Sequence, residues 1–596
     1  MIRRALILSE AQPHTYDFGD FRIDTGKRLL LRSGDHVPLT PKVFDTLLLL
    51  VAHQGQVLDK QELMSAIWPN TAVEENNLNQ NISTLRHIFG ETRGENRYIA
   101  TIPGTGYCFT ADVRTFKVAT QEETPTHVRI AVLPFENLGA GPEREYLADG
   151  LTEETIATIG QIDPEHFSVI GRTSVMRYKC TTRTLAEIGR ELDASYLIES
   201  SLRAEGGLLR ITSKLIRVHD QLQIWSASYD SEPSSLLTFQ RELSIAIAEQ
   251  VRLRLSPVRL TALANRQTQS PEAYDLYLHG RHFWNQLTGP TTRRAIEYFT
   301  RATTLDPGYA LACAGLADCY SSSPVHGDVP PRLVMQNARD AVANAVAAEP
   351  NLAEVQTALG NFNFWLGWDW SAAEAAFRRG IALDPNYPLA HRMLGVVLSH
   401  SCRHDEAQPS MQRARELDPL YAMHQSLSSH IAFAARDYPA AAHFARQALV
   451  VDPEFWIAQL HLAQVAVELG DYDLALDALN KCGRLSVGNT KALSLRGYIF
   501  AKTGRTGEAL EILKTLEAIA RERFVPPYAM ALVHAGLGHT GLALDWLERA
   551  FDAHDVHLVF LTIDPKWDPF RHEPSFMALL KRCDFRNVVP EKSGFL

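Results

Sequence analysis

A proline-containing phrase that recurs at nearly constant spacing constrains the C-terminal half of the chain more than any other feature. Its prolines are separated by 43, 35, 34 and 34 residues. A 34-residue period is that of a helix–turn–helix unit, which buries its apolar face only by stacking on its neighbours. The longer first interval predicts an insertion around residues 321–331 in an otherwise regular all-α superhelix. The phrase occurs as Leu305-Asp306-Pro307, Glu349-Pro350, Leu383-Asp384-Pro385, Leu417-Asp418-Pro419 and Val451-Asp452-Pro453.

Small residues recur where the two helices of a unit must approach closely. With them, and with a proline that ends each unit, the chain resembles tetratricopeptide repeats over residues 274–560. Such an array has a concave face that binds protein segments, so the resemblance implies a protein partner. A spacer or a self-association surface is the alternative. The tail, residues 561–596, loses the period and is expected to cap the array. The small residues include Gly395, Ala432, Ala445, Ala448, Ala463, Gly470, Ala475 and Ala478.

Residues 14–113 are predicted to form an α+β domain. Alternating apolar and polar residues, punctuated by glycines, predict a small antiparallel sheet over residues 16–38. Three helical patterns follow, and a hairpin with a Pro-Gly turn closes the domain. The helices are expected at about residues 40–55, 59–68 and 74–89, and the hairpin at residues 97–109.

The third of these helices has two faces of different chemistry. One face is an apolar stripe at helical spacing, which predicts burial. The other face is rich in uncharged amides and hydroxyls, which packing does not require. Asn and Gln can bridge N6 and N7 of adenine in the major groove, and Ser or Thr can bond a base edge or a phosphate. The stripe is Leu78, Ile82, Leu85 and Phe89, and the polar face is Asn77, Gln80, Asn81, Ser83, Thr84 and Arg86.

Four segments of this domain, LTPKVFDTLLLL, VLDKQELMSAIW, NLNQNISTLRHIF and IATIPGTGYCF, resemble in order and spacing the winged helix-turn-helix of OmpR/PhoB-type transcriptional regulators. The resemblance implies a recognition helix over residues 74–89 in the major groove of double-stranded DNA and a wing over residues 98–110. It implies base contacts by Gln80, Asn81 and Thr84. Phosphate contacts would come from Ser83 and Arg86, with Trp68 and Thr105 in support. Asn77, Arg97 and Tyr107 complete the expected DNA-binding set.

The domain also departs from that family's pattern. Many relatives carry arginine at the positions of Ser83, Thr84 and Pro103, and residues 1–120 hold 13 basic and 13 acidic side chains. Fewer phosphate contacts imply weaker nonspecific binding and a shallower dependence on salt. We therefore expect useful binding only by a homodimer or on tandem sites, where two weak units add. A winged fold used for protein contact is the alternative.

The order of the segments predicts a one-component regulator. OmpR/PhoB relatives often carry a receiver domain ahead of the winged helix, and only about 15 residues precede it here. ToxR/CadC-type relatives place a membrane span after it, whereas no apolar stretch here reaches the roughly 18–20 residues that cross a bilayer. The seven cysteines lack CxxC spacing, which favours free thiols in a reducing cytoplasm. The net charge of −10 belongs to the segments after residue 120.

A polar linker at residues 114–127 leads to a predicted α/β domain at residues 128–255, and a second linker at residues 256–273 precedes the array. The middle domain resembles the TolB-amino-terminal-like (FlgO-like) family, which is uninformative about chemistry. Its acidic residues are expected to form a solvated helix face, and its glycine turn lacks a phosphate-binding pattern. The resemblance is carried by AVLPFENLGAGPEREYLADGLTEETIATI, IGRTSVMRYK, LAEIGRELDASYLIESSLR and QIWSASYD, and the acidic residues are Glu143, Glu145, Asp149, Glu153 and Glu154.

No catalytic, metal or cofactor site is expected. His400, Cys402 and His404 lie in a predicted turn without a fourth ligand at the usual spacing. Cys313 and Cys319 are expected to be small packing residues, and His554 and His557 to be structural.

The sequence as a whole predicts a multidomain protein: an α+β winged helix-turn-helix, an α/β middle domain and an all-α tetratricopeptide superhelix. Its expected function is sequence-specific DNA binding in transcription regulation, with a protein partner or signal received by the array. An interaction scaffold whose winged unit binds proteins is the second hypothesis. An enzyme with activity in the middle domain is the third.

Overall fold

The computed structural model divides into two units, residues 1–126 and 127–596, which are described separately. It describes residues 14–25, 29–32, 35–68, 75–92, 94–117, 128–139, 141, 144–161, 167–205, 208–231, 242, 246, 268, 270–485 and 490–583. The expected linkers at residues 114–127 and 256–273 fall largely outside this described part.

The first unit begins with an antiparallel sheet in the strand order β4-β3-β2-β1-β8, which confirms the sheet predicted over residues 16–38. Its apolar face packs Phe18, Phe21 and Ile23 into the core. The strands are β1 (His14–Phe18), β2 (Phe21–Asp24), β3 (Leu29–Arg32), β4 (Asp35–Val37) and β8 (Arg114–Lys117).

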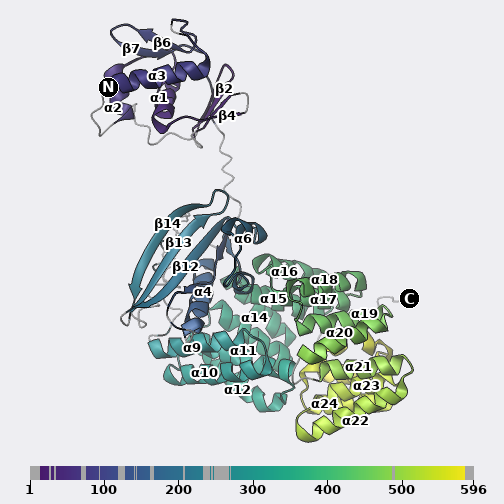
Figure 1. Ribbon diagram of the computed structural model, residues 1–596. Helices are drawn as coiled ribbons and strands as arrows, with labels where there is room; N and C mark the ends of the chain where they lie inside the picture. The colour runs from purple at the N-terminus through teal and green to yellow at the C-terminus, as the bar shows by residue number, and fades with distance from the viewer. Residues whose placement is uncertain are drawn as a thin grey trace. The chain divides into compact units, whose positions relative to one another are not determined.

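Three helices and a second small sheet complete this unit (Figure 1). Pro41 stands in the first turn of α1, and the Asp59 carboxylate caps α2 by accepting a hydrogen bond from the Gln61 amide at 2.7 Å. A Cβ on Gly106 would lie 1.9 Å from the Leu58 carbonyl oxygen, so only glycine allows β7 to pair with β5. The helices are α1 (Pro41–Ala52), α2 (Lys60–Ile67) and α3 (Glu75–Phe89), and the strands are β5 (Val57–Asp59), β6 (Ile99–Ile102) and β7 (Gly106–Phe109).

The second unit opens with a mixed sheet in the order β11-β9-β12-β13-β14, with β10 paired to β12. Strands β11, β9 and β12 run parallel, whereas β12, β13 and β14 form an antiparallel meander. The parallel strands are buried on both faces, as is usual for such strands. The strands are β9 (Val128–Val132), β10 (Glu136–Asn137), β11 (Phe167–Val169), β12 (Tyr196–Glu205), β13 (Leu208–Arg217) and β14 (Leu222–Ser231), and the helices are α4 (Glu145–Gly160), α5 (Arg172–Met176) and α6 (Leu185–Glu191).

Eight antiparallel helix pairs follow, from α9 with α10 to α23 with α24, as the repeat period predicts (Figure 1). The first four pairs are α9 (Pro271–Trp284), α10 (Gly289–Leu305), α11 (Ala310–Gly327), α12 (Pro331–Ala348), α13 (Ala353–Phe362), α14 (Trp370–Leu383), α15 (Pro388–His400) and α16 (His404–Leu417). The last four are α17 (Ala422–Ala434), α18 (Tyr438–Val451), α19 (Trp456–Glu468), α20 (Tyr472–Leu485), α21 (Lys491–Lys502), α22 (Thr506–Glu522), α23 (Pro527–Gly536) and α24 (Thr540–Asp552).

The additional residues of the long interval extend helices rather than forming a loop. Helix α11 continues to Gly327, with Pro324 inside it, and α12 begins at Pro331. The turn therefore stays short, and the additional length projects from one end of the pair. A π-helical segment, η3 (Asn363–Gly367), lengthens α13 in the next unit.

The acidic residues of α4 do not form the solvated face that the sequence suggests. Asp149 is 7% exposed and Glu154 is 2% exposed, because α4 packs against α9 of the array. Tyr277 of α9 donates a hydrogen bond to Glu154 at 3.1 Å, and Asp149 forms ion pairs with Lys179 and His282. The prediction failed because their partners lie in other elements. Glu143 lies outside the described residues.

Beyond that helix contact, the middle domain touches the fourth repeat. The Gly171 amide donates to the Leu417 carbonyl at 2.6 Å, and the Ser174 amide donates to the Asp418 carboxylate at 2.7 Å. Asn386 donates to the Gly160 carbonyl at 3.0 Å. The sheet domain therefore bridges the array from its first repeat to its fourth.

The array also closes on its own later repeats. Lys491 donates to the Val325 carbonyl at 2.6 Å, and Arg523 pairs with Asp328 at 3.3 Å. The His554 ring stacks on Trp368, and its Nε2 donates to the Leu366 carbonyl at 2.6 Å. The residues added in α11 and the η3 segment thus contact helices more than 160 positions later in the chain.

The tail is not only the cap that the sequence predicts. Its last helix, α25 (Pro574–Arg582), packs on α24. The two 3-10 segments before it, η4 (Val556–Thr562) and η5 (Pro565–Phe570), contact repeats further back: Thr562 donates to the His400 carbonyl, and Asp568 pairs with Arg436 at 2.9 Å.

Among the residues set aside in the sequence, His400 needs correction. It lies at the end of α15 and is 1% exposed rather than part of a polar turn. Cys313 and Cys319 are buried, as predicted for packing residues. Within the described part of the chain, no three His, Cys, Asp or Glu side chains are grouped to hold a metal ion. No helix there has the length and apolarity needed to cross a membrane.

Candidate nucleic-acid interface

Helix α3 is anchored by the predicted apolar stripe. Leu78, Ile82, Leu85 and Phe89 are all at most 3% exposed and join the core formed by α1, α2 and both sheets. Because these side chains recur every three or four residues, burying them turns the opposite side of the helix to solvent. The face predicted to read DNA therefore has a fixed orientation.

Four of the predicted residues lie on this open face of α3. Asn77, Gln80, Ser83 and Thr84 are exposed. The Thr84 hydroxyl donates to the Gln80 carbonyl at 2.9 Å, which leaves its lone pairs directed outward. Asn77, Gln80 and Ser83 can therefore donate to or accept from base edges, and Thr84 can accept, without breaking contacts within the protein.

Asn81 differs from the prediction. Its side chain is half-buried, and its amide nitrogen donates to the Thr46 hydroxyl at 2.9 Å and to the Lys42 carbonyl at 3.3 Å. These bonds join α3 to α1. The side chain expected to read a base thus fixes the recognition helix on its support, because it lies at the edge of the polar face nearest α1.

Arg86 also has a structural partner. Its guanidinium donates to the Ile99 carbonyl at 2.8 Å and to the Thr101 hydroxyl at 2.9 Å, both on β6. The side chain that was expected at a phosphate therefore connects α3 with the wing hairpin. Its position near the C-terminal end of the helix directs it toward that strand.

Tyr107, which was predicted to contact DNA, is only 5% exposed and so offers little surface to a ligand. Its hydroxyl donates to the Asn79 side chain at 2.7 Å. The pair forms a second connection between the wing and α3. The strand alternation of the hairpin alone does not indicate which of its aromatic side chains turn inward.

The remaining predicted residues lie around the helix. Arg97 is exposed beside the Tyr98 ring, and Thr105 is exposed at the hairpin turn, so both are open to a phosphate or a groove. Trp68, at the end of α2, is half-buried and packs on the core.

Two exposed residues of α3 were missed. Asn76 and His87 share a stripe with Gln80 and Ser83, at intervals of three and four residues. The sequence shows this spacing, whereas the prediction rested on the amide and hydroxyl residues in the middle of the helix.

The electrostatics agree with the neutral charge count. Lys60, the basic residue at the start of α2, forms an ion pair with Glu75, whose carboxylate raises the pKa of that ammonium. Lys42 donates to the Ile67 carbonyl at 2.5 Å. Two cations near the helix ends therefore have partners within the protein, which limits the positive charge offered to a phosphate backbone.

Comparisons with known proteins agree with the architecture. The family model "Transcriptional regulatory protein, C terminal" matches residues 34–109, and "Tetratricopeptide repeat" matches residues 369–422 and 428–482. The chain is 24% identical over 409 residues to the transcriptional regulator HilA of Salmonella typhimurium, covering 68% of this chain and 71% of that protein.

Two further similarities cover shorter segments. A protein of Rhizobium meliloti that is named as an adenylate cyclase is 31% identical over 195 residues, and the match spans only a third of each chain. The DNA-binding domain of E. coli CadC is 27% identical, with 18% of this chain and all of that one covered and a TM-score of 0.16. Residues 34–109 therefore match the family of transcriptional regulatory proteins, and tetratricopeptide repeats are matched in the C-terminal half of the chain.

Proposed function

We propose that this protein is a one-component transcriptional regulator that binds a specific double-stranded DNA sequence through α3. The observation that carries the proposal is the exposed group of Asn77, Gln80, Ser83 and Thr84 on a helix whose other face is fully buried. Uncharged amides and hydroxyls are the groups that read base edges in the major groove. Arg97 and Thr105 would contact the backbone from the wing.

The array would receive the signal. Tetratricopeptide superhelices bind partners on their inner surface, and here that surface lies in the unit that also contains the sheet domain. A ligand or protein segment bound there would change the state of the second unit, and thereby the geometry of two winged domains on tandem sites. No catalytic step is part of the proposal.

Selection of bound sequences from random DNA with the full chain tests the proposal. A single enriched motif is expected, and Gln80→Ala with Thr84→Ala should remove it, since each lost base contact costs about 1–3 kcal/mol of discrimination. Gln54→Ala is the matched control, because Gln54 is an exposed amide outside α3. An unenriched pool would favour the scaffold hypothesis, in which the winged unit binds proteins.

A further inference from the structure

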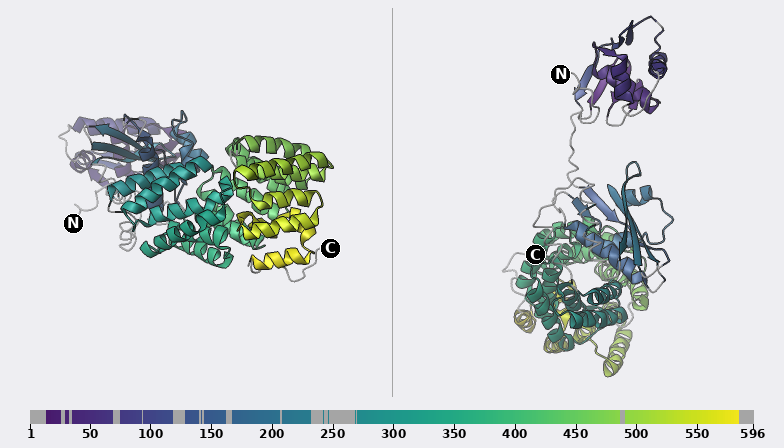
Figure 2. Two further views of the ribbon diagram at one scale, coloured as in Figure 1. Left: turned by 90° about the horizontal axis from the view of Figure 1, so that it is seen from below. Right: turned by 90° about the vertical axis from the view of Figure 1, so that its left-hand side faces the viewer.

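The inner helices of the repeats surround a cavity of about 400 Å³. In the view along the array, the helix pairs are arranged around a common centre (Figure 2). The cavity is lined by residues of α9, α11, α13, α15, α17, α19, α21 and α23, by the end of α4 and the start of α5, and by the η4 and η5 segments of the tail. Its size is within the range of sites for small molecules.

One wall of the cavity carries a half-buried cation that forms no ion pair within the described residues. Arg392 of α15 lies against the Tyr421 ring, with its Cζ 5.5 Å from the ring centroid. Its Nε is buried without a hydrogen-bond partner among the described residues, and its charge acts on the Asp318 carboxylate of the same cavity without forming an ion pair with it. Arg392 is half-buried, so an anion that enters the cavity can reach its guanidinium and form charge-assisted hydrogen bonds with it.

Neutral histidines stand beside this cation. His424, in the first turn of α17, is 1% exposed, and neither of its ring nitrogens has a partner among the described residues. Burial, together with the charges of Arg392 and Arg415, holds the pKa of His424 well below its usual value. A neutral imidazole presents one donor and one acceptor, so His424 offers both to the cavity.

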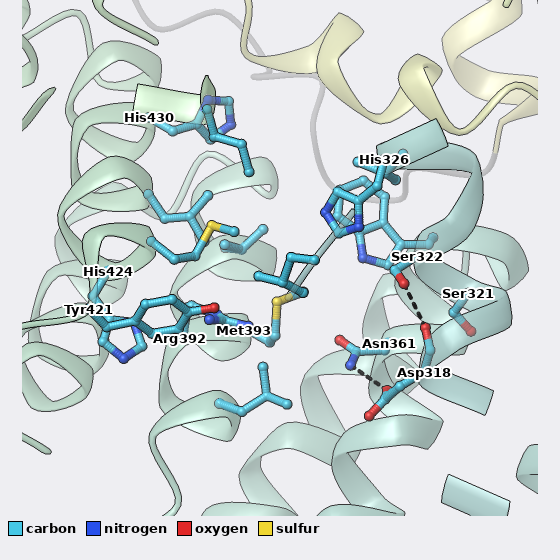
Figure 3. Close-up of a pocket in the computed structure, with 18 of the residues that line it drawn as sticks. Asp318, Ser321, Ser322, His326, Asn361, Arg392, Met393, Tyr421, His424 and His430 are labelled. Atoms are coloured by element: carbon cyan, nitrogen blue, oxygen red, sulfur yellow. Dashed lines mark hydrogen bonds between the residues drawn. The ribbon is translucent and has the colours of Figure 1, made fainter. Parts of the chain in front are cut away.

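The facing wall adds an amide and a carboxyl group. Asn361 of α13 donates to the Asp318 carboxylate of α11 at 2.8 Å, while the Asn361 side-chain oxygen is buried without a partner in the described chain. Figure 3 shows this pair across the cavity from Arg392, Tyr421 and His424. Burial raises the pKa of Asp318 to about 6.

Further buried nitrogens of the lining lack partners within the described residues. His430 of α17 has two such ring nitrogens, and His400 and His557 each have one at Nε2. A polar group buried without a hydrogen bond destabilises the folded chain. Their concentration around one cavity indicates a polar occupant with many hydrogen-bonding groups.

The combination defines the chemistry of that occupant. Arg392 requires a negative charge. The imidazoles require groups that both donate and accept, and the Asn361 oxygen requires a donor; a hydroxyl meets both requirements. Aromatic residues of the lining, among them Tyr421, Trp365 and Trp456, offer apolar surface to a ring. A hydroxyl-free anion would leave the imidazoles unsatisfied, and a neutral sugar would leave the arginine unpaired.

We propose that the cavity binds a small polyhydroxylated anion, either a sugar phosphate or a sugar acid, with its anionic group on Arg392 and its hydroxyls on His424 and Asn361. This site deepens the proposed function by naming the signal, and for that role it rests on the proposed function. Ligand binding itself is measured without DNA, so failure of the site and failure of DNA recognition are distinguishable.

Isothermal titration calorimetry of the full chain tests the site with glucose 6-phosphate, ribose 5-phosphate, gluconate and glucuronate. At least one of these anions is expected to bind with a Kd below about 1 mM. Neutral glucose and ribose, and the hydroxyl-free anions inorganic phosphate and succinate, should bind at least about tenfold more weakly. The relative affinities of the phosphates and the sugar acids identify the anionic group.

Two variants separate binding from folding. Arg392→Gln should weaken the bound anion about 10- to 100-fold and leave the Tm of the ligand-free chain unchanged or higher, because the unpaired charge is removed. His424→Phe keeps a ring of similar size and should weaken the polyhydroxylated anions, while weak binding of inorganic phosphate is unchanged. Arg505→Gln, in an exposed ion pair with Glu508, is the control.

Several outcomes would overturn the proposal. The first is that none of the four polyhydroxylated anions binds to the full chain below about 1 mM. The second is that succinate or glucose binds as tightly as they do, since either the hydroxyls or the charge would then be irrelevant. The third is a lower Tm with unchanged affinity in Arg392→Gln, which would make this residue purely structural.

Discussion

The Glu153 carboxylate of α4 accepts a hydrogen bond from Arg281 Nε of α9 at 2.9 Å, although the two residues are 128 positions apart in the chain. The same carboxylate accepts from Asn285 at 2.9 Å and pairs with Arg172 at 3.3 Å. Both the Glu153 and Arg281 side chains are less than 20% exposed. These contacts fasten the sheet domain to the first repeat and make the second unit a single body.

Glu153→Gln should therefore destabilise the second unit strongly. Removing one charge leaves Arg281 and Arg172 largely buried without their partner, and breaking a buried pair costs about 3–5 kcal/mol. Urea unfolding followed by circular dichroism measures the loss. Asp220→Asn, in a half-exposed pair with Arg217, is the control and should lose much less stability, because water screens an exposed ion pair. Equal losses in both variants would contradict a structural role for the α4–α9 contact.

The pairing of β5 with β7 depends on Gly106. In Gly106→Ala the new methyl group would lie 1.9 Å from the Leu58 carbonyl oxygen, a backbone atom that cannot turn aside. We expect a loss of at least about 2 kcal/mol in the unfolding free energy of the winged domain, because the two strands must separate. Thermal unfolding of the full chain measures it, with Gln56→Ala in the exposed loop as the control. If the unfolding temperature of the winged domain is unchanged in Gly106→Ala, the two strands are not held as closely as described.

Tyr107 and Gln80 should behave in opposite ways. Tyr107→Phe removes the hydrogen bond to Asn79 and should lower stability by about 0.5–1.5 kcal/mol, with DNA affinity within about twofold of the parent. Gln80→Ala should leave stability unchanged and weaken specific binding. Gel-shift titrations on a selected DNA site compare them. A large loss of DNA affinity in Tyr107→Phe at unchanged stability would show that Tyr107 contacts DNA, as the sequence predicts.

DNA affinity should depend weakly on salt. With Lys60 and Lys42 engaged within the protein, few cations remain for phosphates, and the slope of log K against log salt counts the phosphate contacts. We expect a shallow slope on a single half-site and at least about tenfold tighter binding to two half-sites in tandem. Gel shifts at several salt concentrations test both. Tight binding to one half-site, with a steep slope, would contradict this picture.

The array should lose stability in acid. The pKa values of His400 and His461 fall to about 4, mainly through burial. Below pH 6.5 the unfolded chain therefore takes up protons that the folded chain does not, and the unfolding free energy falls by about 1.4 kcal/mol per pH unit for each histidine down to about pH 4. The pKa values of His326, His424 and His430 are lowered as well.

Buried carboxyl groups act in the opposite sense over the same range. Asp318, Asp328 and Asp418 have raised pKa values, so the folded chain holds their protons and becomes relatively more stable as the pH falls. In the described part of the array the pKa values of five further histidines are also lowered, and Glu468 is one further carboxyl group with a raised pKa. The shifted histidines therefore outnumber the shifted carboxyl groups, and a net loss of stability is expected. Urea unfolding at pH 7 and pH 5 shows whether the histidines or the carboxyl groups dominate. A higher urea midpoint at pH 5 would mean that the carboxyl groups dominate.

Much of the local structure followed from the sequence because periodicity reports burial directly. The stripe from Leu78 to Phe89 specified both the existence of α3 and its open face. The proline spacing specified the helix pairs of the array. The alternation in residues 16–38 specified the first sheet. In each of these cases an apolar face is buried against another apolar face. The prediction of burial does not depend on which element provides that second face.

The partners of polar side chains were predicted less well from the sequence. Asn81, Arg86 and Tyr107 carry groups that suit DNA, yet each has a partner within the domain at 2.7–2.9 Å. The sequence predicts that Glu153 and Asp149 lie on a solvated helix face, but in the structure both have partners on α9. A hydrogen bond or an ion pair needs one particular atom within about 3 Å, and sequence spacing does not provide that distance across separate elements.

The sequence by itself determined the order of the segments, the helix pairs of the array and the amide and hydroxyl face of α3, since each depends on residue types at fixed local intervals. Only the tertiary structure decided which polar groups have partners in the protein, how the tail and α11 close the array, and that Arg392, His424 and Asn361 meet at one cavity. Those outcomes depend on contacts between residues that are far apart in the chain. Each repeat is rotated slightly relative to the one before it, and the sum of these rotations decides which side chains of distant repeats meet.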